Sequence, residues 1–380
     1  MIKYSLKIPQ AIYSGENSLE NIKTIVKNSK KIALFTDKGI QGAGLLDNVI
    51  NQLEGVEVVI FNELPAEPTC DEAQKVIDEF KTSNADFIIA VGGGSVMDIA
   101  KLASIAITDD YGVRDLLDNP QIGVKSIKTL MIPTTAGTGS EATPNSIVAV
   151  PEKELKVGIV NEAMIPDYVI LDAIMIKNLP FKIAAATGVD ALAHAIECFT
   201  SKKATPFSDM FALESLELII NNIEKACLNP DAMEAKNNMM LAAFYAGVAI
   251  TASGTTAVHA LSYPLGGKYH IPHGVSNAMM LVPVMKFNEP VCRPLLAKAY
   301  DRVVKNGRET TEEAKSAWMI EKLGNIVEKL EIPTSLKEYG VDNKDLDVLV
   351  ESGMNVQRLL VNNMREVTKE DARALYLEIM

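Results

Sequence analysis

The chain has 380 residues, of which 48% are hydrophobic, and this size indicates two or three globular domains with an ample core. Its 37 basic and 49 acidic side chains give a formal net charge of −12, which argues against nucleic acid or an anionic membrane as a partner. The 4 cysteines lie far apart without a CxxC pair, and the first residues lack the apolar core of a signal peptide. We therefore expect a cytoplasmic protein with reduced thiols.

The first half of the chain alternates short apolar runs with amphipathic segments. Strands are predicted, in chain order, over residues 31–36, 56–61, 87–91, 128–132 and 168–171. Helices are predicted between them, as over residues 71–81 and 96–107. This alternation is typical of an α/β domain with a largely parallel sheet, whose ligands bind at the carboxyl ends of the strands. We expect this domain to span residues 1–180.

After Leu179 and Pro180 the strand signals fade. Long helical patterns follow, over residues 184–199, 209–223, 235–252 and 312–330. We predict a helical domain over residues 181–380, with the active site in the cleft between the two domains. No Lys, Arg, Asp or Glu occurs from Asn237 to Gly267, but the stretch is rich in small and hydroxyl residues and contains His259. A buried helix that lines a site explains it better than a membrane span does.

Two loops that follow predicted strands are candidates for holding a dinucleotide. Gly92-Gly-Gly-Ser95 joins a strand to a helix, where glycines let the backbone approach a phosphate and the helix N-terminus offers free N–H groups. It matches neither GxGxxG nor a Walker loop, and a simple tight turn explains it equally well. The second loop, Thr134–Glu141, is rich in small residues and in hydroxyls that can bind a pyrophosphate or a ribose.

Asp37 ends an earlier predicted strand. A carboxylate at this place can accept hydrogen bonds from the ribose hydroxyls of a cofactor and repel a 2′-phosphate, which favours NAD over NADP. The alternative role for Asp37 is that of a helix N-cap or a turn residue, which is common for aspartate.

All 4 histidines of the chain lie between residues 194 and 273. Asp190 and His194 are four residues apart in a predicted helix, so their side chains share one face and can reach one ion. His259 lies in an uncharged helical stretch, where a buried imidazole needs a partner, and His273 lies in a turn. Ordinary packing explains each histidine alone. Together, one carboxylate and three imidazoles suit a first-row divalent metal with an open coordination position.

These motifs carry a resemblance to a known family. The glycine loop, Thr134–Glu141, Gly188–His194 and Pro272–Gly274 resemble the iron-containing (group III) alcohol dehydrogenases, and the resemblance extends over essentially the whole chain. It implies the dehydroquinate synthase-like fold, in which an α/β nucleotide-binding domain precedes an all-α metal-binding domain. It also implies hydride transfer between a small primary alcohol or its aldehyde and NAD(H), with a metal that polarises the oxygen. A homodimer or larger homo-oligomer is implied as well.

The resemblance further assigns residues to sites. The residues that it implies as ligands of Fe(II), or in some members Zn(II), are Asp190, His194, His259 and His273. The residues that it implies as contacts of NAD are Asp37, Gly93, Gly94, Ser95, Asp98, Thr134, Thr135, Thr138, Asn145, Lys156 and Leu179.

The chain departs from the family pattern at Tyr263, four residues after His259, where many members carry a second histidine near the nicotinamide. A tyrosine with its unperturbed pKa of about 10 relays protons poorly, so Tyr263, His270 and water all stay open as catalytic relays. Packing against the cofactor is the alternative role for Tyr263, and an outer-shell or surface place is the alternative for His270. Glu67 is a second departure, since relatives often carry Asn there.

Three competing functions stay open. A non-redox lyase of the same fold needs arginines for its anionic substrate, but no Arg occurs between Arg114 and Arg293. A zinc glycerol dehydrogenase fits the three histidines less well than an iron enzyme does. A non-enzymatic binding protein has no need of a four-ligand set beside two nucleotide loops. Lys156 and Lys268 leave room for one acidic group on the substrate, so small aldehydes, diols and hydroxy acids all stay open.

Overall fold

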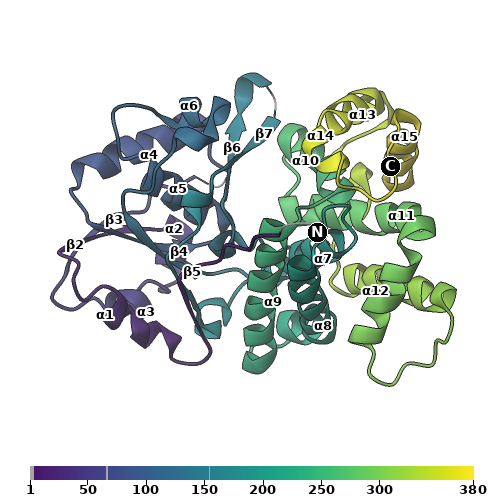
Figure 1. The fold of residues 1–380 in the computed structure, drawn as a ribbon, viewed down its shortest axis with the longest axis horizontal. Coiled ribbons are helices and arrows are strands. Elements are labelled where there is room, and N and C mark those ends of the chain that lie inside the picture. Colours follow the sequence, from purple (N-terminus) through teal and green to yellow (C-terminus); the bar gives the residue numbers. More distant parts are fainter. Residues whose placement is uncertain (1–3, 66, 154) are drawn as a thin grey trace. The chain divides into compact units, whose positions relative to one another are not determined.

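The computed structural model describes residues 4–65, 67–153 and 155–380. The chain divides into two compact units, Lys7–Leu179 and a second that combines Pro180–Met380 with the N-terminal residues up to Leu6. The first unit contains a parallel sheet flanked by helices, and the second is built of helices (Figure 1). The predicted fold class, an α/β part followed by an all-α part, is confirmed.

A six-stranded parallel sheet forms the centre of the first unit, in the order β1-β8-β5-β4-β2-β3. Its strands are β1 (Ala11–Ser14), β2 (Lys31–Phe35), β3 (Glu57–Phe61), β4 (Phe87–Gly92), β5 (Lys128–Pro133) and β8 (Tyr168–Leu171). All of these except β1 lie within one residue of a predicted strand. β4 is buried along its whole length, as expected for a parallel strand with a covered face on each side.

Helices cover both faces of this sheet (Figure 1). The helices of the first unit are α1 (Ile22–Ile25), α2 (Lys38–Gly42), α3 (Asp47–Ile50), α4 (Cys70–Thr82), α5 (Gly94–Ile105) and α6 (Val113–Asp118). Ile22 and Val49, from α1 and α3, pack in one apolar cluster with Leu34 of β2. On the opposite face Phe80 of α4 meets Phe35 edge-on, with ring centroids 5.5 Å apart. The alternation of strand side chains thus gives each face its own helices.

A separate antiparallel hairpin, which we did not predict from the sequence, follows the threonine-rich loop. It consists of β6 (Asn145–Val150) and β7 (Leu155–Val160), paired so that Ala149 faces Lys156. The hairpin is tied to the rest of the unit because the N–H of Ala149 donates to the carbonyl of Pro68 at 2.8 Å. It therefore brings two predicted cofactor residues, Asn145 and Lys156, into the α/β unit.

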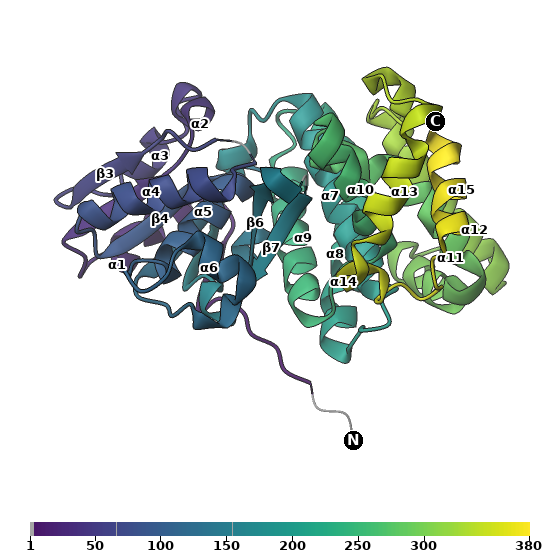
Figure 2. The same ribbon diagram turned by 90° about the horizontal axis from the view of Figure 1, so that it is seen from above.

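The second unit is organised around a long buried helix. Its helices are α7 (Phe181–Phe199), α8 (Pro206–Leu228), α9 (Met233–Ala252), α10 (Ala257–Tyr269), α11 (His273–Val303), α12 (Glu312–Lys329), α13 (Leu346–Met354), α14 (Gln357–Leu360) and α15 (Lys369–Ile379). Every residue of α7 from Gly188 to Phe199 is buried, and α8, α9 and α11 pack around it. Figure 2 shows α10 beside α13, and α13 beside α15.

The uncharged stretch from Asn237 to Gly267 forms most of α9 and α10. In the part of the chain that the structure describes, no single helix is long and apolar enough to cross a membrane. α9 and α10 meet the criteria of length and composition only as a pair, bent by 106° at the break between them. Both helices bury a large share of their residues within the unit, as the sequence predicts for helices that line a site.

Gly274, the second residue of α11, leaves no room for a side chain. A Cβ atom there would lie 2.1 Å from the backbone oxygen of Ala186 in α7. We expect Gly274→Ala to lower the free energy of unfolding by about 1–3 kcal/mol or more, because backbone has to move to relieve the clash. Denaturant unfolding with a fixed metal content measures the effect.

Gly324→Ala is the matched control in the same unit. A Cβ atom at Gly324 in α12 would meet only Cγ2 of Val282, at an ordinary 3.7 Å. Since alanine favours a helix interior over glycine by roughly 0.5–1 kcal/mol, this variant should be neutral or more stable. Equal destabilisation of both variants would contradict the packing argument.

Candidate active site

One face of α7 carries three ionisable side chains. Asp190, His194 and Glu197 follow one another at helical spacings of four and three residues, so they lie on the same side of the helix. All three are buried among apolar side chains. Buried charges need partners or they neutralise, and the partners here come from the first turns of α10 and α11.

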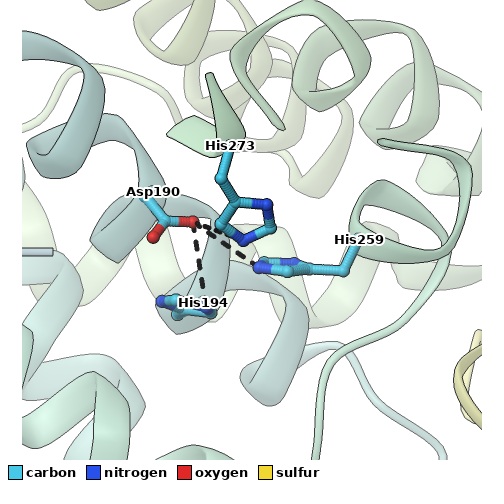
Figure 3. Close-up of side chains that lie close together, drawn as sticks. All are labelled: Asp190, His194, His259 and His273. Carbon is cyan, nitrogen blue, oxygen red and sulfur yellow. Dashed lines mark ion pairs between the residues drawn. The ribbon is translucent and has the colours of Figure 1, made fainter. Parts of the chain in front are cut away.

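Asp190, His194, His259 and His273 point toward one another from three helices (Figure 3). One ligand atom of each lies within 4.8 Å of the other three. Oδ1 of Asp190 is 3.6 Å from Nε2 of His259, 3.6 Å from Nε2 of His273 and 3.8 Å from Nε2 of His194. Atoms bound to one ion at about 2.1 Å can lie at most about 4.2 Å apart, so these separations fit a shared metal.

Glu197 fixes the orientation of His259. Its Oε2 accepts a hydrogen bond from Nδ1 of His259, which turns Nε2 of the same ring toward Asp190. Its Oε1 accepts from the Thr256 N–H at 2.9 Å, the Thr256 hydroxyl at 2.7 Å and the Val258 N–H at 2.8 Å. No N-cap side chain serves α10, so Glu197 also satisfies the free N–H groups at the start of that helix.

Asn277 lies one turn after His273 in α11 and contacts several members of the cluster. Its Nδ2 donates to Oδ1 of Asp190 at 2.7 Å and lies 3.1 Å from Nε2 of His259 and 3.2 Å from Nε2 of His273. The Ser262 hydroxyl donates to Oδ1 of Asn277 and so sets which end of the amide faces the cluster. Asn277 is fully buried, which suits an orienting residue.

The sequence analysis missed both orienting residues, although each leaves a signal. Glu197 is seven residues after Asp190, so it shares the face of α7 that carries two predicted ligands. Asn277 is four residues after His273, the same spacing as that between Asp190 and His194. A polar residue at such a spacing inside an apolar helix is the pattern that would have identified them.

Burial and neighbouring charges shift the pKa values of the cluster residues in opposite directions. Burial would raise the pKa of Asp190, but the surrounding imidazoles, first His194 and His273, hold it well below its usual range. Burial lowers the pKa of His194 to about 4, so this imidazole is neutral at pH 7. Burial would also lower the pKa of His259, but Glu197 and Asp190 outweigh it and raise the pKa to about 10. The two buried carboxylates therefore favour positive charge between them, and a divalent cation supplies it.

The cluster is exposed on the side of His273 and Tyr263. The side chains of Asp190 and His259 are 3% and 2% exposed, whereas that of His273 is 34% exposed. The Tyr263 ring lies 5.9 Å from the ring of His273 and 6.5 Å from that of His259. His270, by contrast, ends α10 with an exposed side chain and is not a member of the four-residue group. Of the two predicted relays, only Tyr263 lies beside the cluster.

In the first unit, the two predicted cofactor loops lie against each other at the carboxyl ends of β4 and β5. The N–H of Thr134 donates to the carbonyl of Gly92 at 3.0 Å, and a Cβ at Gly94 would lie 2.9 Å from Cγ2 of Thr138. Gly93 precedes α5 without a side-chain cap, so the first turn of α5 keeps N–H groups for a ligand. The buried Thr134 hydroxyl has no partner among the described residues. A polar ligand such as a pyrophosphate fits this loop pair.

Asp37 follows β2, the strand next to β4. Its Oδ1 accepts from the N–H of Ile40 at 2.9 Å and thereby caps α2, so the alternative role considered from the sequence is present. This bond uses one of two carboxylate oxygens and is compatible with a second donor such as a ribose hydroxyl. The preceding Thr36 has a buried hydroxyl without a partner in the described part of the chain.

Glu67 contacts both Lys156 and Ser95. The ammonium of Lys156 pairs with a carboxylate oxygen of Glu67 at 2.6 Å, and the N–H of Glu67 donates to Oγ of Ser95 at 3.1 Å. The departure at Glu67 thus places a carboxylate next to two predicted cofactor contacts. Thr135 is also close to the glycine loop, since a Cβ at Gly93 would lie 3.7 Å from its Cγ2.

Asp98, another predicted cofactor residue, is tied to the threonine-rich loop and the hairpin. Its carboxylate accepts from the Ser140 hydroxyl and from the N–H of Ile147 at 2.9 Å, and it pairs with Lys101 at 3.0 Å. Lys101 is fully buried and also donates to the carbonyls of Ser140 and Asn145, while burial lowers its pKa. Asp98 and Lys101 therefore support the threonine-rich loop from behind.

Leu179 is the last residue of the first unit. It follows the 3₁₀ turn Ala173–Ile176, and its N–H donates to the carbonyl of Ile176 at 3.3 Å. This bond is local, and the contact of Leu179 with the cofactor stays a prediction.

Comparison with known proteins identifies the family. The model of the iron-containing alcohol dehydrogenases matches residues 9–173, and that of the C-terminal part of the Fe-containing alcohol dehydrogenase family matches residues 184–380. Long-chain-alcohol dehydrogenase 1 of Geobacillus thermodenitrificans (strain NG80-2) is 32% identical over 375 residues, which cover 97% of this chain and 94% of that protein. NAD-dependent methanol dehydrogenase of Bacillus methanolicus is 29% identical over 349 residues, or 91% of this chain and 92% of the relative.

Comparison with solved structures gives the same family. A crystal structure of 1,3-propanediol oxidoreductase matches with a TM-score of 0.92 and 27% identity, and the match covers 100% of each chain. The chain therefore belongs to the iron-containing alcohol dehydrogenase family. It is an oxidoreductase that interconverts alcohols and aldehydes.

Glu197→Gln tests the orienting role of the buried carboxylate. Glutamine keeps the size of the side chain but removes the charge that holds the His259 imidazole in place. We expect metal affinity to fall by roughly 10–100-fold, the usual cost of losing such a partner. Competition with a graded series of chelators measures it. Glu378→Gln, at an exposed position of α15, is the control, and an equal loss in both variants would contradict the assignment.

Proposed function

We propose that the chain is a metal-dependent, NAD(H)-linked dehydrogenase for a small primary alcohol and its aldehyde, with Fe(II) as its metal and Zn(II) as the second candidate. The observation that carries this proposal is the buried group of one carboxylate and three imidazoles, oriented by Glu197 and Asn277. This donor set suits a first-row divalent ion and provides four protein ligands without filling an octahedral shell.

The chain's own residues hold and shape this site. Asp190, His194, His259 and His273 would bind the metal. When bound, the metal supplies a Lewis acid for the alcohol or aldehyde oxygen, and the nicotinamide exchanges the hydride. Burial of Asp190 and His194 excludes water from the inner side of the centre, so the substrate approaches from the side of the partly exposed His273.

Tyr263 stands at this open side, and its hydroxyl lies 3.4 Å from Nη2 of Arg358. We assign it to the wall of the substrate site and the proton transfer to water. His270, exposed at the end of α10, receives no catalytic role.

The nucleotide loops would hold NAD in the first unit. The residues that we propose to contact it are Asp37, Gly93, Gly94, Ser95, Thr134, Thr135, Thr138, Asn145, Lys156 and Leu179. Asp98 belongs to the same proposed site, with its carboxylate held in place by Ser140 and Lys101. The NAD dependence of the methanol dehydrogenase relative supports this cofactor. We also propose that the protein works in the cytoplasm as a homodimer or larger homo-oligomer.

An anaerobic assay of NADH oxidation on Fe(II)-loaded protein, over a panel of short aldehydes, tests the proposal. We expect turnover that a chelator abolishes and that added Fe(II) restores. His273→Ala should lose both bound metal and activity, because it removes one of four ligands. His270→Asn, which keeps a residue tolerant of the left-handed backbone, is the control and should stay active. A metal-loaded, active His273→Ala would refute the ligand set, and wild-type protein without turnover on any aldehyde would favour the non-redox lyase.

Asp37→Asn tests cofactor selection. Asparagine can still cap α2 but no longer repels a 2′-phosphate, so the preference for NADH over NADPH should fall by roughly tenfold or more. The ratio of kcat/KM for the two cofactors measures it, and Asp37→Gly shows whether the cap contributes. The same ratio in wild type and both variants would remove Asp37 from the cofactor site.

A further inference from the structure

Arg358, in α14, contacts Tyr263 at the open side of the metal cluster and has no acidic partner among the described residues. Its Nη2 donates to the Tyr263 hydroxyl at 3.4 Å, and its guanidinium carbon lies 5.8 Å from the Tyr263 ring centroid. Tyr263 in turn lies 5.9 Å from the ring of His273, the most exposed of the four candidate ligands. Arg358 is itself exposed, so its guanidinium is accessible to a ligand that binds beside Tyr263.

Most other arginines of the chain have a partner within the protein, whereas Arg308, which is exposed, has no ion pair with a described carboxylate but lies far from the cluster in the sequence. The four that form ion pairs with carboxylates are Arg114, Arg293, Arg302 and Arg373. Arg365 packs over the ring of Phe287 at 3.9 Å and donates to its carbonyl. No ion pair connects Arg358 to a described carboxylate, although acidic residues outnumber basic ones by 49 to 37. A guanidinium with free donors in a planar fork is suited to a carboxylate or a similar oxyanion.

We propose that Arg358 binds an anionic group at the far end of the substrate, so that the preferred alcohol is a short ω-hydroxy acid. The inference rests on the proposed function and adds the substrate class to it. The guanidinium lies 5.8 Å from the Tyr263 ring, which is itself 5.9 Å from the His273 ring, and this limited reach suits a short substrate. A single guanidinium pairs with one anionic group, so we expect one such group on the substrate.

The anion takes no part in the reaction. The alcohol carbon loses a hydride to NAD⁺ and the hydroxyl loses a proton, which gives the aldehyde, NADH and H⁺. Arg358 therefore contributes binding and orientation of the remote end, while the cluster around Asp190 acts on the reacting end.

Kinetics on a matched pair of substrates tests this. The pair is a four-carbon ω-hydroxycarboxylate and the α,ω-diol of equal length, assayed with Fe(II)-loaded protein and NAD⁺. We expect Arg358→Gln to raise the KM of the acid by roughly 10–100-fold, the loss of a charge-assisted hydrogen bond, and to change that of the diol by less than about twofold. Arg358→Lys should fall between, because it keeps the charge without the fork. Arg308→Gln, which removes another exposed guanidinium, is the control and should match wild type.

Calorimetry with butyrate provides a readout that needs no turnover. Any contact of butyrate with the metal is common to all variants, so a dissociation constant at least about tenfold weaker in Arg358→Gln than in wild type and Arg308→Gln supports the proposal. Equal dissociation constants in all three proteins overturn it. If Arg358→Gln instead loses activity equally on the acid and the diol and melts at a lower temperature, Arg358 only holds α14 on Tyr263. That result also overturns the proposal. Wild type that binds metal, NAD⁺ and butyrate but oxidises neither alcohol refutes the proposed function instead.

Discussion

Two buried carboxylates on one face of α7 set the architecture of the helical unit. Asp190 and Glu197 lie in a stretch in which every residue is buried, so positive charge and hydrogen-bond donors have to come from neighbouring elements. Glu197 accepts from the N–H groups that begin α10 and from His259, and Asp190 accepts from Asn277 of α11. The same bonds that place these helices therefore also aim imidazoles at one point. Metal binding and local stability are thus coupled, because a change at Glu197 disturbs the start of α10 as well as the orientation of a ligand.

The sequence predicts those parts of the candidate site that depend on residue type and on spacing within one helix. Asp190 and His194 share a helix face by their spacing alone, whereas the approach of His259 and His273 rests on the family resemblance, because contacts between helices are set by tertiary packing. Glu197 and Asn277 were not predicted, since a buried acid or amide is recognised only when its partners are known. Asp98 was assigned to the cofactor site by the family resemblance alone, and its bonds to Lys101 and Ser140 come from tertiary packing that no sequence window contains.

The fold was predictable where hydrophobic periodicity is strong and much less so where local signals conflict with packing. Strands such as β4 and β5 are continuous apolar runs bounded by polar residues, and their ends were predicted within one residue. The 31-residue helix α11 was not predicted, because Pro283, Pro290 and Pro294 each remove a backbone donor and are typical of helix ends. Burial of α11 against α7, α10 and α12 offsets that local cost. The hairpin of β6 and β7 was missed for a similar reason: tertiary contacts behind it, such as those of the buried Lys101, lie outside any sequence window.

The solvent exposure of the side chains increases from the metal cluster to the proposed substrate contacts. This order separates the residues that hold the metal from those that select the substrate. Asp190 and His259 are almost fully buried, His273 is 34% exposed at its side chain, and Arg358 is exposed. Substitutions at buried, bonded positions cost stability and metal together, whereas substitutions at exposed positions usually change stability by less than about 0.5 kcal/mol. Residues such as Arg358 can therefore change with little effect on the fold, and the identity of the substrate depends on them. The chemistry of the reacting oxygen depends instead on the part of the unit that tolerates change least.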